Sequence, residues 1–205
     1  MKNFVQSLKD YKWLVVFTLA YLIPFTAYFL SQDNGEFIWY IVVVILLIAL
    51  VIGTLPKSQL SRGVVWGLSV WALLHLAGGS VKVGETVLYG LQLIPLYNGG
   101  GEMILLKYDQ VVHAFGFGLA ARTMLHFLRR YQPDRNKVGV YIIAVLAGMG
   151  LGVINEIVEF IATLLFPGNG VGGYVNTSLD LIFNTLGAVV AVWCAWLMRV
   201  KSKAD

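Results

Sequence analysis

The stretch VGVYIIAVLAGMGLGVINEIVEFIATLLF, residues 138–166, decides the fold class of this chain. A helix needs about 20 apolar residues to cross the hydrocarbon core of a bilayer, which is roughly 30 Å thick. Glu156 and Glu159 lie three positions apart inside this stretch, so they share one helix face. The stretch therefore predicts a membrane-spanning helix that carries two carboxyl groups on one side.

The rest of the chain has the same apolar character. Of its 205 residues, 58% are hydrophobic and 13% are charged, and the mean hydropathy is +0.75. Soluble domains contain about 25% charged residues, so the composition excludes a soluble enzyme, a disordered chain and a disulfide scaffold. We expect an all-α, polytopic integral membrane protein that forms one transmembrane domain over residues 1–205. Its six predicted spans are 13–30, 37–55, 64–79, 108–128, 138–166 and 179–198.

One further segment, residues 84–96, is apolar in part but too short to span a membrane. It is followed by glycines at positions 99, 100 and 101, which we interpret as a hinge. The segment therefore predicts a short interfacial or re-entrant helix that ends at Pro95.

Basic residues are distributed unequally between the two sides of the predicted bundle. Only Lys82 and Lys107 fall on the side opposite the termini. Twelve fall on the side of the termini: Lys2, Lys9, Lys12, Lys57, Arg62, Arg129, Arg130, Arg135, Lys137, Arg199, Lys201 and Lys203. The positive-inside rule then predicts a multi-pass protein of the cell (inner) membrane with both termini in the cytoplasm. This asymmetry accounts for the net charge of +4, so no nucleic-acid partner is expected.

Ionisable and amide side chains gather at one depth, in the outer leaflet, on four predicted helices. At about 1.5 Å per residue, seven of them fall near the outer helix ends: His75, Asp109, His113, Glu156, Glu159, Asp180 and Asn184. No Lys or Arg is expected at that depth, and the inner halves of these helices are almost wholly apolar apart from Arg122. Ionisable residues inside a membrane are costly and usually mark a functional site.

Several carboxylates in a low-dielectric site cannot all stay ionised without a cation, so a proton or a metal ion must be bound. Carboxylate oxygens with one or two imidazoles suit Zn²⁺, Mn²⁺, Fe²⁺ or Mg²⁺. A hydrogen-bond network that only holds the helices together, or a proton or ion path, would use the same residue types. The candidate metal ligands are Asp109, His113, Glu156, Glu159 and Asp180; His75, His113 and Glu156 are the candidate catalytic residues; Asn184 and Asn155 are the candidates for orienting them.

Three motifs in this order resemble two families of membrane proteins. Asp109-x3-His113, Glu156-x2-Glu159 and Asp180-x3-Asn184-x2-Gly187 are similar to the pattern of the VanZ-like membrane proteins. The chain resembles the uncharacterised YjdF-type inner-membrane family more closely, over about residues 70 to 190. That resemblance rests also on His75-Leu-Ala-Gly78, Leu88-Tyr89-Gly90 and the run from Tyr108 to His113.

The resemblance implies a shared polar core and names no reaction. Glu159 stands where the VanZ-like pattern has glutamine, and Asn176 stands where the YjdF type tends to carry a further acid. VanZ-like proteins are associated with glycopeptide resistance at the cell envelope. A non-catalytic envelope factor that binds lipid or antibiotic is therefore one of the functions to consider.

The residues favour a metal-dependent intramembrane hydrolase or transferase. Its expected partners are membrane lipids, and its expected substrate is a lipid or lipid-linked envelope molecule that enters an outer-leaflet pocket from the bilayer. The metal would activate water or polarise a phosphoryl or carbonyl oxygen. The main alternative is a small proton- or ion-coupled transporter that uses the same carboxylates.

Overall fold

The computed structural model describes residues 10–33, 35–100, 103–131, 138–166 and 172–201. Six helices within these ranges are long and apolar enough to cross a membrane, so the predicted fold class is confirmed. The last of them begins at Tyr174, ahead of the predicted start at residue 179. The six helices are α2 (Lys12–Ser31), α3 (Gly35–Ser58), α4 (Arg62–Ser80), α5 (Tyr108–Tyr131), α6 (Val138–Leu165) and α7 (Tyr174–Lys201).

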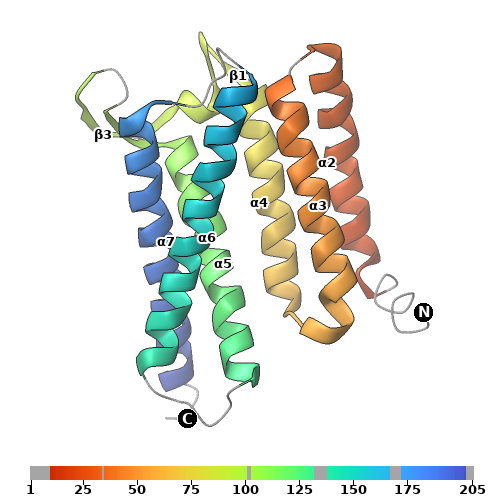
Figure 1. Ribbon diagram of the computed structural model, residues 1–205, viewed down its shortest axis with the longest axis vertical. Helices are drawn as coiled ribbons and strands as arrows, with labels where there is room; N and C mark the ends of the chain where they lie inside the picture. Colours follow the sequence, from red (N-terminus) through yellow and green to blue (C-terminus); the bar gives the residue numbers. More distant parts are fainter. Residues whose placement is uncertain (1–9, 34, 101–102, 132–137, 167–171, 202–205) are drawn as a thin grey trace.

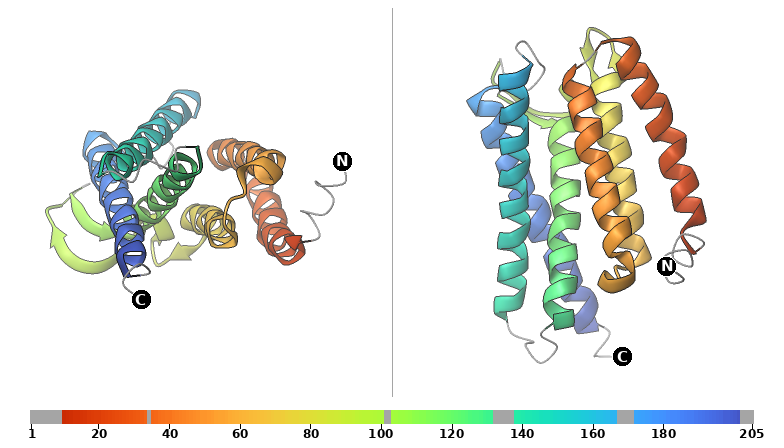
Figure 2. Two further views of the ribbon diagram at one scale, coloured as in Figure 1. Left: turned by 90° about the horizontal axis from the view of Figure 1, so that it is seen from below. Right: turned by 45° about the vertical axis from the view of Figure 1, so that its right-hand side comes forward.

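The helices run alternately up and down, so α2 begins and α7 ends at the same end of the bundle (Figure 1). We call this the terminal end, and the opposite end the hairpin end. Helices α2, α3 and α4 form one group and α5, α6 and α7 a second one (Figure 2), and α4 packs against α5 to join them. The predicted site residues lie near the end of α4, the start of α5, the end of α6 and the start of α7. All four of these helix termini therefore lie at the hairpin end.

Two antiparallel hairpins cover the hairpin end, and the predicted interfacial or re-entrant helix over residues 84–96 is wrong. The strands are β1 (Lys82–Val83), β2 (Thr86–Val87), β3 (Gln92–Asn98) and β4 (Ile104–Lys107). The only helical part is a three-residue 3-10 turn, η1 (Leu88–Gly90). β3 pairs with β4, and Pro95, which has no N–H to donate, lies where the register shifts between Gln92 and Tyr97, a position that tolerates proline. β-Branched residues such as Thr86 and Val87 also favour strands over a short helix.

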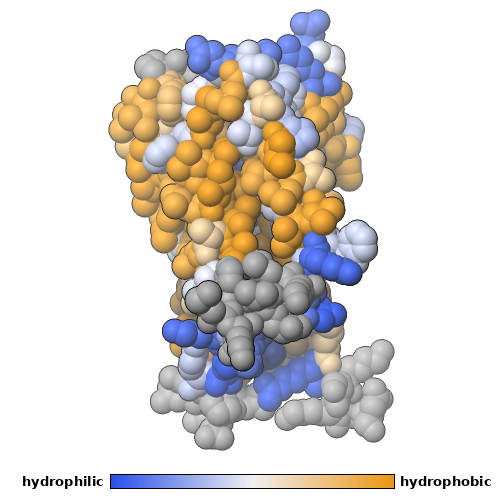
Figure 3. Space-filling view, turned by 90° about the vertical axis from the view of Figure 1, so that its right-hand side faces the viewer, coloured by the Kyte–Doolittle hydropathy of each residue, from blue (hydrophilic) through white to orange (hydrophobic). Residues whose placement is uncertain are grey.

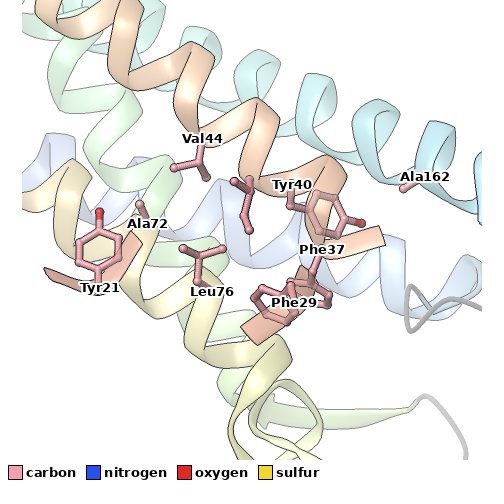
Figure 4. Packing of buried hydrophobic residues seen from close by; sticks show 9 residues of the cluster. Tyr21, Phe29, Phe37, Tyr40, Val44, Ala72, Leu76 and Ala162 are labelled. Atoms are coloured by element: carbon pink, nitrogen blue, oxygen red, sulfur yellow. The ribbon is translucent and has the colours of Figure 1, made fainter. Parts of the chain in front are cut away.

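Aromatic side chains form the main contact among the first three helices. Phe29 and Phe37 stack with their ring centres 4.5 Å apart, and Tyr40 and Leu76 are buried beside them (Figure 4). Ala162 of α6 belongs to the same cluster, so this core also joins the two helix groups near the hairpin end. The cluster fixes α3 and α4 beside the helices that carry the site.

On the face of the bundle seen in Figure 3, the coloured surface is apolar over its middle and polar at its ends. Large side chains such as Ile23, Leu46 and Leu164 are more than 60% exposed. Exposed apolar surface of this extent is unsuited to water and fits contact with lipid tails. The space-filling view therefore agrees with the helix lengths that mark the chain as membrane-embedded.

Candidate functional site

Glycines allow α5, α6 and α7 to approach closely at the level of the predicted site. A Cβ atom at Gly187 of α7 would overlap the backbone carbonyl of Ala114 on α5. A Cβ at Gly152 of α6 would lie 2.9 Å from Nδ2 of Asn184. Small residues at such crossings let backbones come together inside a membrane. The polar side chains of the three helices consequently meet in one place.

His113 lies at the centre of this meeting point and is 5% exposed. Its Nδ1 lies 3.1 Å from Oδ1 of Asn184, and Nδ2 of Asn184 donates to Oε1 of Glu156 at 3.3 Å. Because a carboxylate accepts only, the amide nitrogen of Asn184 faces Glu156 and its oxygen faces His113. In the neutral imidazole this network assigns the hydrogen of His113 to Nδ1 and the lone pair to Nε2.

The Nε2 atom of His113 faces two further carboxylates. It lies 3.5 Å from Oδ1 of Asp109 and 3.7 Å from Oε1 of Glu159. Both distances exceed an ordinary hydrogen bond, which extends to about 3.2 Å. They lie near the ligand-to-ligand separation of about 3.4 Å around a tetrahedral ion with bonds of about 2.1 Å. Each of these two distances suits a pair of ligands on one ion, and Asp109 and Glu159 belong to different groups around His113.

Asp180 supplies the most buried carboxyl group of the site. It is fully buried, and its Oδ2 accepts a hydrogen bond from Nδ2 of Asn176 at 2.6 Å. Its Oδ1 has no hydrogen-bond donor among the residues that the structure describes. Donor atoms of Asp109, His113 and Asp180 all lie within 4.8 Å of one another. A bound cation would satisfy the oxygen that the protein leaves without a donor.

A second group of the same kind shares His113. It contains Glu156 and Glu159, whose donor atoms also lie within 4.8 Å of one another and of the imidazole. Asn155, a candidate orienting residue, donates from Nδ2 to Oε1 of Glu159 at 2.6 Å. The structure thus brings together all five candidate ligands in two triads that share His113. The two candidate orienting residues, Asn184 and Asn155, contact these triads.

Lys107 lies close to the site, contrary to the expectation that no Lys or Arg reaches that depth. It is the last residue of β4, and its Nζ donates to Oδ1 of Asn176 at 2.5 Å. Asn176 in turn contacts Asp180, so the ammonium group acts on the site through one intervening amide. A long, flexible side chain at the membrane surface can reach a buried group in this way.

Gln110 is fully buried and was not among the predicted site residues. Its Oε1 accepts from the backbone N–H groups of Leu106 and Lys107, and its Nε2 donates to the carbonyl of Ile104. Leu106 adopts the left-handed region with φ of 63°, which a non-glycine residue rarely does. Gln110 therefore holds the end of β4 where the chain enters α5 and places Asp109. In the sequence, the one indication of this role was that Gln110 directly follows Asp109 in the first turn of a predicted helix.

His75 lies outside both triads. Its Nδ1 is 2.5 Å from the Tyr89 hydroxyl, and the rings of Tyr40 and Trp71 pack around it at 5.4 and 5.9 Å. Burial, reinforced by the charge of Asp109, raises the pKa of the Tyr89 phenol well above its usual value. The phenol therefore stays protonated and donates to His75, whose Nδ1 is unavailable to a metal ion.

Below the site, small and apolar side chains fill the space among α5, α6 and α7. Ala121, Ala144 and Ala188 are fully buried there, together with Leu125 and Val192. A Cβ at Gly148 would come within 2.7 Å of the Ala121 methyl group, so the helices touch directly. The described part of the chain therefore closes the site on the side of the terminal end.

The family model described as "Predicted membrane protein (DUF2238)" matches residues 13–201, and the chain belongs to this family. No curated protein and no solved structure gives a match. The YjdF-type resemblance is consistent with this family, whereas the VanZ-like resemblance is not supported by any match.

Proposed function

We propose that this member of the DUF2238 family binds a divalent metal ion through Asp109, His113 and Asp180 and acts on a lipid or lipid-linked molecule. The observation that carries the proposal is a pair of potential ligand atoms on two residues of this triad, one facing carboxylates at 3.5 Å or more and the other facing no donor among the described residues. These are the Nε2 lone pair that the hydrogen bond with Asn184 assigns to His113, and the Oδ1 of Asp180 that lacks a donor among the described residues.

Hydrolysis or transfer of a headgroup fits this set of residues. A divalent ion would polarise the phosphoryl or carbonyl oxygen and favour ionisation of water. Glu159, 3.7 Å from His113, would accept the proton of the attacking water or alcohol. The oxygen of that nucleophile then bonds to the reacting centre as the bond to the leaving alcohol breaks. That alcohol takes the proton back from Glu159, so the site returns to its starting state.

Access to this site would come from the hairpin end. The side chains of Asp109 and Glu159 are 16% and 13% exposed, against 5% for His113. Asp109 lies in the first turn of α5, directly after β4. With twelve basic residues toward the terminal end, the positive-inside rule supports cytoplasmic termini in the cell membrane and an outward-facing hairpin end. Substrates would then arrive from the outer leaflet.

The first test is the metal content of the purified protein and of two histidine variants. We expect His113→Ala to lose nearly all bound metal, because the only imidazole of both triads is removed. His126→Ala is the matched control: His126 lies in the same helix but contacts the carbonyl of Ser58 at the terminal end. Elemental analysis after purification in detergent provides the measurement. A metal-free wild type, or equal metal in both variants, would contradict the proposal.

The second test separates an enzyme from a carrier by the route that water takes. In a background with Cys194→Ser, single cysteines would replace Ala114, Ala121 and Leu125 along α5. We expect a membrane-impermeant thiol reagent to label position 114 from outside only, and to label neither 121 nor 125, since these lie in the closed apolar layer. A carrier needs polar access at successive depths. Labelling of position 114 from the cytoplasmic side would contradict the proposal of an enzyme and support a carrier instead.

A further inference from the structure

A separate cavity of about 240 Å³ lies among α2, α3 and α4, toward the terminal end. Its walls are drawn from residues 11–22, 44–55 and 65–72 and are almost entirely hydrocarbon. Helices α2 and α3 lie on the side of the bundle away from α5, α6 and α7 (Figure 2). The cavity thus faces the lipid and not the site around His113.

The depth of this cavity corresponds to one leaflet of the bilayer. Its lining on α2 and on α3 extends over eleven residue steps each, from 11 to 22 and from 44 to 55. At 1.5 Å per residue each run measures about 16 Å, which is close to half of a hydrocarbon core of roughly 30 Å. The cavity therefore begins near the membrane surface at the terminal end and stops near the midplane.

Three hydroxyl groups among the lining residues pair with one another. Oγ of Ser69 lies 2.7 Å from Oγ1 of Thr18 and 3.2 Å from the Tyr21 hydroxyl. These three hydroxyls need no polar ligand, and the surface of the lining is almost entirely hydrocarbon. An apolar cavity of about 150 Å³ in a protein stays dry and accepts apolar molecules. A larger one inside a membrane suits a hydrocarbon chain.

Three basic residues stand where this cavity reaches the membrane surface. Lys12 follows the lining residue Tyr11, Lys57 lies two positions after Leu55, and Arg62 lies three before Val65. All three are exposed. Basic side chains at a membrane surface attract anionic lipid headgroups.

We propose that the cavity holds one acyl chain of an anionic phospholipid from the leaflet at the terminal end. Lys12, Lys57 and Arg62 bind its phosphate. The lipid fills the space between α2 and α3 and so stabilises the first helix group. It is distinct from the substrate of the metal site: Trp71 and Phe117, whose ring centres are 6.4 Å apart, stand between the cavity wall and His113.

Binding of the acyl chain can be tested by native mass spectrometry. The protein is first reconstituted with phosphatidylglycerol and phosphatidylcholine and then washed in detergent. We expect one retained phosphatidylglycerol molecule, which is lost when Ile48→Trp fills the cavity. Leu50→Trp is the matched control, because Leu50 lies on the same helix, is 61% exposed and does not line the cavity. Val15→Phe narrows the same space and serves if Ile48→Trp does not fold.

The headgroup is tested by neutralising the basic residues. We expect Lys57→Gln and Arg62→Gln each to weaken retention of phosphatidylglycerol about fivefold, and Lys82→Gln at the hairpin end to leave it unchanged. Equal retention in Ile48→Trp and Leu50→Trp, or equal retention of the two lipids by the wild type, would overturn the proposal. The proposal would also be overturned if the wild type were a dimer and Ile48→Trp converted it to a monomer without loss of lipid. A second copy of the protein would then occupy the cavity.

Discussion

Replacement of Gly187 by alanine is expected to destabilise the protein by about 3 kcal/mol, at the upper end of the usual cost of overpacking. The added methyl group would overlap the carbonyl of Ala114. A side chain could rotate out of the way, but this carbonyl belongs to the backbone of α5 and is fixed by the helix. The two helices must therefore move apart, which also separates His113 from Asn184 and opens the site.

A melting experiment in detergent measures this effect, with Gly150→Ala as the control. Gly150 lies in the middle of α6, and a Cβ there meets nothing within 4 Å. Alanine at that position should be neutral or stabilise by up to about 1 kcal/mol through its helix propensity. We expect the melting temperature of Gly187→Ala to fall by about 6 to 12 °C. Equal melting temperatures for the two variants would show that α5 and α7 do not touch at this point.

Asp180→Asn is expected to remove the metal ion and with it most of the stabilisation that the ion gives. A ligand present at 1,000 times its dissociation constant stabilises the folded state by about 4 kcal/mol. The substitution keeps the size of the side chain but removes the charge of the fully buried ligand group. Glu156→Gln should act in the same direction, because it removes a negative charge 3.5 Å from His113 and so weakens the attraction of the site for a cation.

The measurement is the melting temperature with added metal and with chelator, together with metal content. Glu85→Gln is the control, since Glu85 is an exposed acid at the same hairpin end. We expect the chelator to lower the melting temperature of the wild type and of Glu85→Gln but not of Asp180→Asn. If the cluster were only a hydrogen-bond network, Asp180→Asn would raise the melting temperature without changing the metal content, and the metal proposal would be abandoned.

The parts of the site that follow from one helix could be predicted from the sequence. Asp109 and His113 are four residues apart, and Glu156 and Glu159 three, so each pair shares a face whatever the tertiary structure. The common depth of the pairs followed from the rise per residue, because the helices cross the same membrane. These local rules placed the candidate residues at one depth, whereas the close approach of α5, α6 and α7 at their glycines brings the five candidate ligands together.

Contacts between distant segments could not be predicted in this way. The hydrogen bond from Lys107 to Asn176 joins residues 69 positions apart, and it depends on how α7 is rotated against β4. The pairing of β3 with β4 likewise depends on a partner strand that residues 84–96 alone do not reveal. His75 has the right depth for the site, but the rotation of α4 turns it toward Tyr89 instead.

The glycine contacts also bear on how sequences of this family can diverge. At Gly148 the nearest atom is the methyl carbon of Ala121 at 2.7 Å, and the next are two backbone atoms of Ala121 at 3.2 Å. Gly148→Ala combined with Ala121→Gly would therefore remove the closest contact and leave a crossing that needs only a small shift. Such a reciprocal exchange is an accessible evolutionary path, and the two positions should covary among relatives. At Gly187 the obstacle is a main-chain carbonyl, which no change at Ala114 can shorten. Selection should therefore hold position 187 as glycine, while position 148 drifts together with its partner.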